Sequence, residues 1–280
     1  MDWSKTKTIL IEIIIIINIV LFGFIFADYY KNMDRTIKHS FIEEVRNRLL
    51  DKNIKIDTNI PRTKSKLPSL LVEFESYSKT DINNRFFDSK GKIEDPNEEF
   101  TRITKDEEVI SIINTRRIIY ENLVEEEKDS INYTKAMEVA EEFLLRRGFS
   151  IDNMVCSYIE KSENNYILHY SKVFDGVIIE KSYTNFIINN ENVLSMDRLW
   201  INVLEVSQNT LAVESAPKAL LNLLDSDEIY DKTIEKIEQC YYFDPESQGF
   251  VEDITKAVQG RAIPAWRIEF RDGDSIVLGD

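Results

Sequence analysis

The sequence contains few of the residues that most often carry out catalysis or bind metals. Its 280 residues include two histidines, His39 and His169, and two cysteines, Cys156 and Cys240. Neither histidine lies in a nucleophile motif such as Gly-x-Ser-x-Gly, and the four side chains do not have the spacing of a zinc site. We therefore expect no Ser-His-Asp catalysis, no bound metal and no other cofactor.

Glycine and basic residues are also scarce. Eight glycines argue against a glycine-rich nucleotide-binding loop. The chain carries 35 basic and 50 acidic side chains, a formal net charge of −15. This balance argues against nucleic acid as a partner, because binding to phosphate depends on Lys and Arg. The abundant carboxylates leave acid–base catalysis open, but no pair of them stands out.

One long apolar run lies near the N-terminus. Residues 9–27 are almost all apolar, with aromatic residues on both sides. A membrane-spanning helix needs about 20 such residues, with aromatic residues at the two interfaces. The run is longer than the apolar core of a cleaved signal peptide, and a cut after Ala27 would place Ile25 where a small residue is preferred. We therefore predict an uncleaved transmembrane helix over 9–27, with residues 1–8 preceding it.

Two polar side chains interrupt this run. Glu12 lies near its start, where the carboxylate can reach the interface or become protonated, and Asn18 lies near its centre. A polar side chain in lipid costs free energy unless it finds a partner. We predict that Glu12 and Asn18 contact a transmembrane helix of another protein. The alternative is that Asn18 bonds locally within its own helix.

The remaining residues alternate between helical and strand patterns, which predicts an α+β fold. Helices are expected to about Leu50, from Thr134 as N-cap to Gly148, and over 217–224. The first of these is indicated by apolar residues spaced four apart, namely Met33, Ile37, Phe41, Val45 and Leu49. Strand patterns and the Asp-Gly pairs at 175–176 and 272–273 predict antiparallel hairpins.

These patterns divide the chain beyond residue 27 into two parts. A membrane-proximal helix and a first α+β subdomain cover 28–130, and a second α+β subdomain covers 131–280. The second part contains the order helix, strand, Asp-Gly turn and strand twice, which predicts an internal duplication. Cys156 and Cys240 occupy corresponding strands of the two copies. Two alternatives stay open for these cysteines: they form a disulfide, or they are two unbonded, buried thiols.

The sequence resembles the YycI family, also called WalI. The resemblance rests on the opening residues 1–8 before the Ile-rich run, on 175–180 and the strand ending at Trp200, on 241–245, and on 263–268. It implies a regulatory membrane protein of the WalK–WalR (YycG–YycF) two-component system, with no catalytic residues and a YycH-like fold of PepSY-type subunits. It also implies a cytoplasmic N-terminus, an extracytoplasmic C-terminal domain, and complexes with a YycH-like protein and a WalK-like histidine kinase.

We therefore expect a non-catalytic regulator that is held in the cell membrane by a single span. Together with YycH it would modulate the WalK kinase, which controls cell-wall metabolism. Two alternatives stay open, namely a membrane-anchored surface hydrolase that uses paired carboxylates and a passive envelope-binding module. In each of the three cases the lipid bilayer is a partner.

Overall fold

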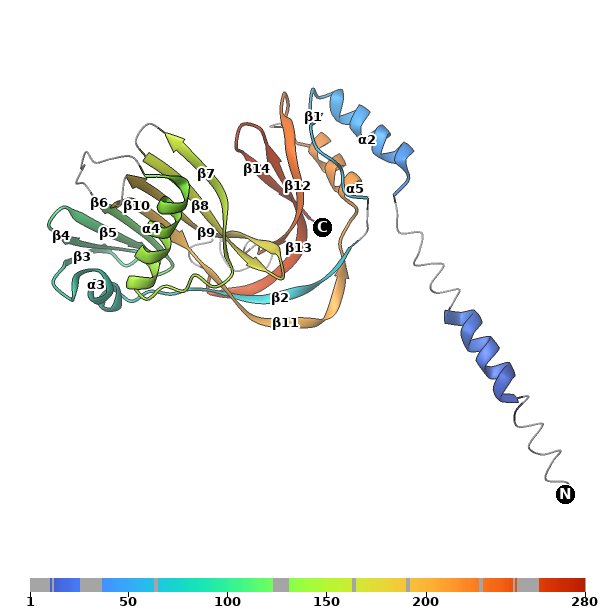
Figure 1. The fold of residues 1–280 in the computed structure, drawn as a ribbon, viewed down its shortest axis with the longest axis horizontal. Coiled ribbons are helices and arrows are strands. Elements are labelled where there is room, and N and C mark those ends of the chain that lie inside the picture. Colours follow the sequence, from blue (N-terminus) through green and yellow to red (C-terminus); the bar gives the residue numbers. More distant parts are fainter. Residues whose placement is uncertain are drawn as a thin grey trace, which may run out of the picture.

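The computed structural model describes residues 11, 13–25, 37–62, 65–122, 131–162, 165–189, 192–226, 229–243, 245 and 257–279. Helices and strands combine in an α+β arrangement around a large mixed sheet (Figure 1). The α+β class predicted from the sequence is therefore confirmed. We keep the labels of Figure 1 for the elements.

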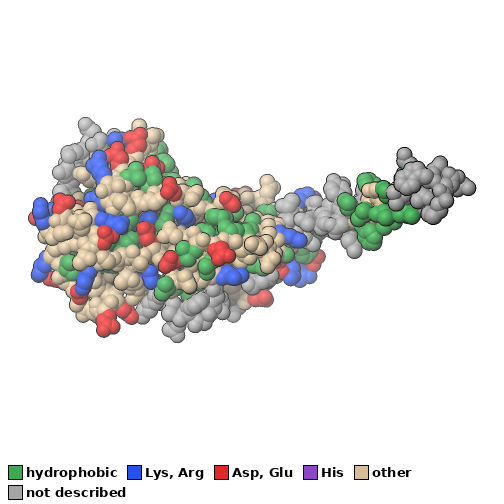
Figure 2. Space-filling view, turned by 90° about the horizontal axis from the view of Figure 1, so that it is seen from below, with side chains coloured by type: hydrophobic (Ala, Val, Ile, Leu, Met, Phe, Trp, Pro, Cys, Tyr) green, Lys and Arg blue, Asp and Glu red, His purple; other side chains and the backbone are tan. Residues whose placement is uncertain are grey.

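Residues 13–25 are helical, and their apolar side chains are exposed. Figure 2 shows these side chains as a green surface on the segment that carries the N-terminus. None of the helices in the described ranges is both long and apolar enough to cross a membrane. The span predicted over 9–27 lies partly outside those ranges, because Ile9, Leu10, Glu12, Phe26 and Ala27 are not described.

Four further helices follow in the described ranges, and local capping explains where two of them begin. They are α2 (His39–Leu50), α3 (Lys79–Phe87), α4 (Tyr133–Arg146) and α5 (Ala216–Leu221), the last continuing as the 3₁₀ turn η1 (Asn222–Leu224). The Ser78 hydroxyl caps α3, and the Asn132 side chain caps α4 by accepting from the Lys135 amide. The predicted cap Thr134 is therefore wrong, since that residue already lies inside the helix.

Fourteen strands pair in the described part of the chain. They are β1 (Lys55–Ile56), β2 (Lys66–Phe74), β3 (Lys92–Asn97), β4 (Phe100–Lys105), β5 (Glu108–Ile113), β6 (Arg117–Asn122), β7 (Met154–Ser162), β8 (Asn165–Phe174), β9 (Val177–Asn189), β10 (Asn192–Leu199), β11 (Ile201–Ala212), β12 (Thr233–Tyr242), β13 (Gln259–Phe270) and β14 (Ser275–Leu278). The main path through the sheet runs β11-β2-β13-β12-β9-β10-β6-β5-β4-β3, and β7, β8, β1 and β14 pair beside it.

The sheet has two halves that meet at β9. In the first half, β3 to β10 are antiparallel, with α3 and α4 packed on them. The second half contains β1, β2 and β11 to β14, with α2 and α5 packed together on it. A short parallel contact joins β9 to β12 at Ile178 and Ile179. In Figure 1, β2 and β11 form a long antiparallel pair along the lower side of the second half, extending toward the first half.

The two subdomains predicted over 28–130 and 131–280 are hydrogen-bonded into this one sheet. Strand β6 pairs with β10, and β2 pairs with both β11 and β13. The Asp-Gly turns join β8 to β9 and β13 to β14, as the hairpin signals indicated. The internal duplication stays a prediction.

Buried apolar side chains form three clusters. One lies between the first half of the sheet and helices α3 and α4, and a second lies between β12–β14 and helices α2 and α5. The third contains Phe74, Ile179 and Phe243, and it fills the region where β2, β9 and β12 approach one another. The junction between the halves is therefore packed as a core.

Candidate functional site

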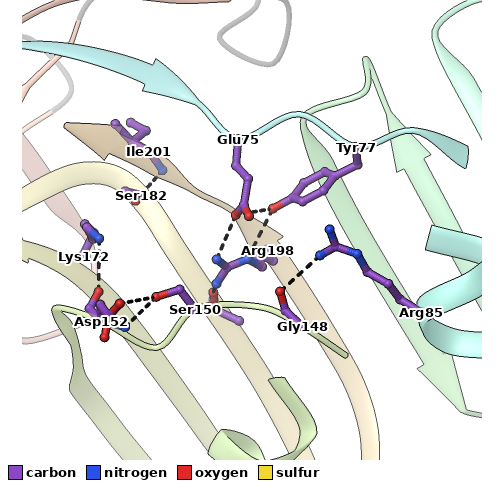
Figure 3. Close-up of polar contacts among 11 residues, drawn as sticks. Glu75, Tyr77, Arg85, Gly148, Ser150, Asp152, Lys172, Ser182, Arg198 and Ile201 are labelled. Atoms are coloured by element: carbon purple, nitrogen blue, oxygen red, sulfur yellow. Dashed lines mark hydrogen bonds and ion pairs between the residues drawn. The ribbon is translucent and has the colours of Figure 1, made fainter. Parts of the chain in front are cut away.

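The most deeply buried charged side chain that the structure describes lies at this junction. Arg198 is the penultimate residue of β10, and its side chain is 0% exposed. An isolated buried charge is costly, so such a residue needs an opposite charge and several hydrogen-bond acceptors around it. The surroundings of Arg198 supply both (Figure 3).

The Arg198 guanidinium makes three hydrogen bonds to side chains from other strands and loops. Nη2 donates to Glu75 Oε2 at 2.9 Å, Nη1 donates to Thr184 Oγ1 at 2.8 Å, and Nε donates to the Tyr77 hydroxyl at 3.3 Å. The Tyr77 hydroxyl in turn donates to Glu75 Oε2 at 2.8 Å. Burial raises the pKa of Tyr77, so this phenol stays neutral and serves as a donor.

Aromatic rings complete the enclosure of the guanidinium. Its central carbon lies 4.3 Å from the centroid of Trp200 and 5.1 Å from that of Phe149. Lys172 lies over the same Trp200 ring, with 5.3 Å between Nζ and the centroid, and donates to the Asp152 carbonyl at 3.1 Å. Burial lowers the pKa of Lys172, as expected for a cation next to another cation and away from water.

Main-chain hydrogen bonds run through the same region. The Glu75 amide donates to the Trp200 carbonyl at 2.8 Å, and the Ile201 amide donates to the Ser182 hydroxyl at 2.9 Å. These contacts hold the end of β2, the middle of β9 and the β10–β11 connection in one place. The cluster therefore fixes the two halves of the sheet relative to each other. The cluster makes this region rigid, because the Arg198 guanidinium is held by hydrogen bonds to three side chains. The guanidinium is also buried, so a substrate cannot reach it.

The histidines lie apart from this cluster. His39 is exposed on α2 beside Glu43, with 3.8 Å between Nδ1 and Oε1. His169 lies on β8, where its ring centroid is 5.2 Å from that of Tyr158, and burial lowers its pKa. Within the described ranges, no group of three or more His, Cys, Asp or Glu residues could hold a metal ion.

Acidic residues gather most closely around Arg267 on β13. Its guanidinium lies 2.7 Å from Glu180, 3.0 Å from Glu238 and 2.7 Å from Glu269. These carboxylates come from β9, β12 and β13, so the ion pairs support the parallel contact between the two halves. Each of these three carboxylates therefore already has Arg267 as its ion-pair partner.

Both cysteines are free thiols in the structure, so the disulfide that the sequence left open is absent. Cys156 is partly exposed on β7, whereas Cys240 is fully buried on β12. Burial raises the pKa of both thiols. The two strands belong to different halves of the sheet: Cys156 packs against the core of the first half, whereas Cys240 lies where β12 pairs with β9.

We expect alkylation of the native protein to modify Cys156 and to spare Cys240. The thiolate is the reactive form, and Cys240 becomes accessible only when a core strand opens. The rate at Cys240 should be lower by a factor on the order of a hundred. Mass spectrometry after timed iodoacetamide treatment measures both rates. Equal rates in the native protein would contradict the burial of Cys240, and equal rates in denaturant serve as the control.

Of the two polar residues predicted to contact a partner helix, Glu12 lies outside the described residues. Asn18 is exposed within helix 13–25, and its side-chain amide donates to the Ile14 carbonyl at 2.9 Å. This is the local bond that was the alternative to partner contact. It uses one of the two amide hydrogens and leaves the carbonyl oxygen unused by that bond.

Sequence reasoning missed the Arg198 cluster because its partners are distant in the chain. The available signal was the alternation near the end of β10, where Met196 and Arg198 are buried and Asp197 between them is not. An arginine two residues after a buried methionine occupies an inward position in a strand. Its partner Glu75 is 123 residues away, so the pairing could not be read from local spacing.

Comparison with solved structures places this arrangement among known α+β folds. A protein from Eubacterium rectale matches with a TM-score of 0.52 at 9% identity, over 88% of this chain and 96% of that one. YycH from Bacillus subtilis matches with a TM-score of 0.50 at 14% identity, over 75% of this chain and 52% of the YycH chain. The C-terminal domain of YpeB from Bacillus megaterium matches over 88% of this chain and 100% of its own, at 9% identity, but its TM-score of 0.34 is too low to establish a shared fold.

The chain is therefore an α+β protein with a YycH-like fold. The sequence profile of the YycI protein family matches residues 32–277, which is most of the chain. The chain belongs to the YycI family, and this membership supports a regulatory role in the YycFG two-component system. Comparison with curated protein sequences gives no significant match.

Proposed function

We propose that this chain is a membrane-anchored, non-catalytic regulator that acts with a YycH-like protein on a sensor histidine kinase of the WalK type. The observation that carries the proposal is the match of the YycI family to residues 32–277. The match begins at residue 32, beyond the apolar run at residues 9–27.

The exposed helix at residues 13–25 supports the membrane anchor. Its side chains include Ile16 at 60% exposure and Phe24 at 72% exposure. Each square ångström of apolar surface left in water costs about 25 cal/mol, and a contiguous exposed apolar surface marks an interaction site. Burial in a lipid bilayer removes this cost. Residues 9–27 then form the span, residues 1–8 are cytoplasmic, and the sheet lies outside the cell membrane.

The mechanism we propose is a shift in the conformational population of the kinase. A regulator changes this population only by the difference between its affinities for the two kinase states. The rigid junction around Arg198 favours such a role, because it keeps the contact surface of the sheet in one shape. In our proposal the chain contacts the kinase through this sheet and also through the span.

We expect Asn18→Leu to weaken the association of the span with its partner about threefold, because an interhelical hydrogen bond in a membrane contributes about 0.6 kcal/mol. The test is photo-crosslinking from reporter positions next to residue 18 in native membranes. Crosslinks to the kinase or to the YycH-like protein should form and should decrease in the variant. Ile16→Leu is the matched control, since it keeps an apolar side chain on a different face of the helix.

If reporters around Asn18 crosslink to lipid alone, the span is an attachment and the proposed contact is wrong. If the crosslinks form equally well with leucine at position 18, the span still contacts its partner but without using the amide. In that case the local bond to Ile14 accounts for Asn18 by itself.

A further inference from the structure

A cavity of about 340 Å³ opens along helix α4 in the first half of the sheet. The ends of β5, β6 and β10 form one side of it, and α4 forms the other. This volume falls at the lower end of the range for sites that bind small molecules. Its charged lining residues are Glu108, Lys135, Glu142, Arg146 and Arg147.

Arg147 is the unusual residue of this cavity. Its guanidinium carbon lies 3.5 Å from the ring centroid of Phe143, 4.8 Å from that of Phe86 and 5.7 Å from that of Tyr120. Nη1 donates to the Phe143 carbonyl at 3.3 Å. Buried Nε has no hydrogen-bond partner among the residues that the structure describes. Burial lowers the pKa of this guanidinium.

The nearby carboxylates are already engaged by other groups. Glu108 accepts a short hydrogen bond from the Tyr120 hydroxyl, and Glu142 pairs with Arg146 at 2.8 Å. Glu108 still attracts Arg147 through space, but no ion pair joins the two. Arg198, the other arginine enclosed by aromatic rings, has Glu75 within 2.9 Å. Arg147 is partly exposed, unlike Arg198, but it also stacks on aromatic rings and has no carboxylate in ion-pair contact among the described residues.

We propose that this cavity is a binding site for a small molecule that carries a single carboxylate, which pairs with Arg147. The site is independent of the anchor and of kinase binding.

The ion pairs of the lining favour a single carboxylate. Lys135 pairs with Glu138 at 3.5 Å and Arg146 pairs with Glu142 at 2.8 Å, so Arg147 is the lining cation that a ligand would pair with. Glu108 and Glu142 line the same cavity, and their charges repel a doubly charged phosphate more strongly than a single carboxylate. The planar guanidinium also matches the geometry of a carboxylate. Apolar Val139 and Val193 suit a small aliphatic group beside it.

The test uses the full-length chain in nanodiscs at low salt and follows the arginine Nε–Hε signals by NMR. The signal that disappears in Arg147→Gln is assigned to Arg147. The probes are N-acetylalanine, its uncharged amide and inorganic phosphate. We expect N-acetylalanine to shift the Arg147 signal saturably, the amide to leave it unchanged, and phosphate to bind more weakly. Arg147→Gln should reduce the affinity for N-acetylalanine at least about tenfold.

Arg85→Gln provides the matched control. Arg85 also lies over a phenylalanine ring, with 5.4 Å to the centroid of Phe149, and also donates to a main-chain carbonyl, that of Gly148. It differs in having a carboxylate partner, Asp81 at 2.8 Å, and in lying outside the cavity lining. Its substitution should leave the affinity unchanged. The proposal is overturned if the shift does not saturate, if the amide binds as well as the acid, if phosphate binds more tightly, or if Arg147→Gln retains the affinity.

Discussion

Replacing Arg198 by methionine is expected to lower the free energy of unfolding by about 3–5 kcal/mol, because it leaves a carboxylate of a buried pair without its cation. Glu75 and the Tyr77 hydroxyl lose their charged partner, and the space beside Trp200 is filled less well. For a domain of this size the melting temperature should fall by about 10 °C. Thermal unfolding followed by circular dichroism measures the change.

A double-mutant cycle separates the pair from simple packing loss. Glu75→Gln alone should also destabilise the fold strongly, because Arg198 then stays buried without a carboxylate. The double variant should lose clearly less than the sum of the two single losses. Strictly additive losses would show that Glu75 and Arg198 do not act as a pair.

Arg117→Met is the matched control for this experiment. Arg117 on β6 makes a bidentate ion pair with Asp197, the residue directly before Arg198, at 2.8 and 2.6 Å. Its side chain is 33% exposed, so water compensates for most of the loss. We expect a cost of about 1 kcal/mol. A loss as large as that of Arg198→Met would contradict the role given to burial.

The second large effect is expected at Gly260 in β13. A Cβ atom at this position would lie 2.1 Å from Cε2 of Phe243 and 2.5 Å from Cζ. Phe243 is buried against Phe74, with 5.8 Å between the ring centroids, so the ring cannot move aside freely. Gly260→Ala should therefore cost about 3 kcal/mol through overpacking. Denaturant unfolding at constant temperature measures this cost.

Removing the obstructing ring tests the cause. In a Phe243→Leu background, Gly260→Ala should be tolerated better than in the native chain, because the two nearest ring atoms, Cε2 and Cζ, are gone. Gly279→Ala is the control, since a Cβ there comes no closer than 3.3 Å to its nearest neighbour, Ala265. An equal cost at both glycines would rule out the contact with Phe243 as the explanation.

Local signals made part of the fold predictable. The hairpin between β8 and β9 was indicated by Asp175-Gly176, and both residues have positive φ angles, 48° and 79°, as a two-residue hairpin turn requires. Helix α4 was indicated by its apolar face and by Gly148, whose φ of 72° ends the helix. In both cases the information lies within a few adjacent residues.

Other elements gave no such signal. Helix α3 has nine residues and mixed polarity, and the capping Ser78 with Asp81 three residues later was the available indication. Strand β3 is almost entirely exposed and contains Pro96, so it lacks the alternation by which strands are recognised. The Arg198 cluster and the Arg147 cavity depend on contacts between distant segments, which the order of residues does not reveal.

The most direct test of the central claim is kinase autophosphorylation in proteoliposomes that contain the WalK-type kinase and the YycH-like protein. Adding the full-length chain should change the rate by about fivefold or more, the lower end of typical coupling between binding sites. The same chain with residues 9–27 replaced by an unrelated apolar span should lose most of this effect. An unchanged rate on adding the native chain, or a full effect with the replaced span, would contradict regulation through the membrane anchor.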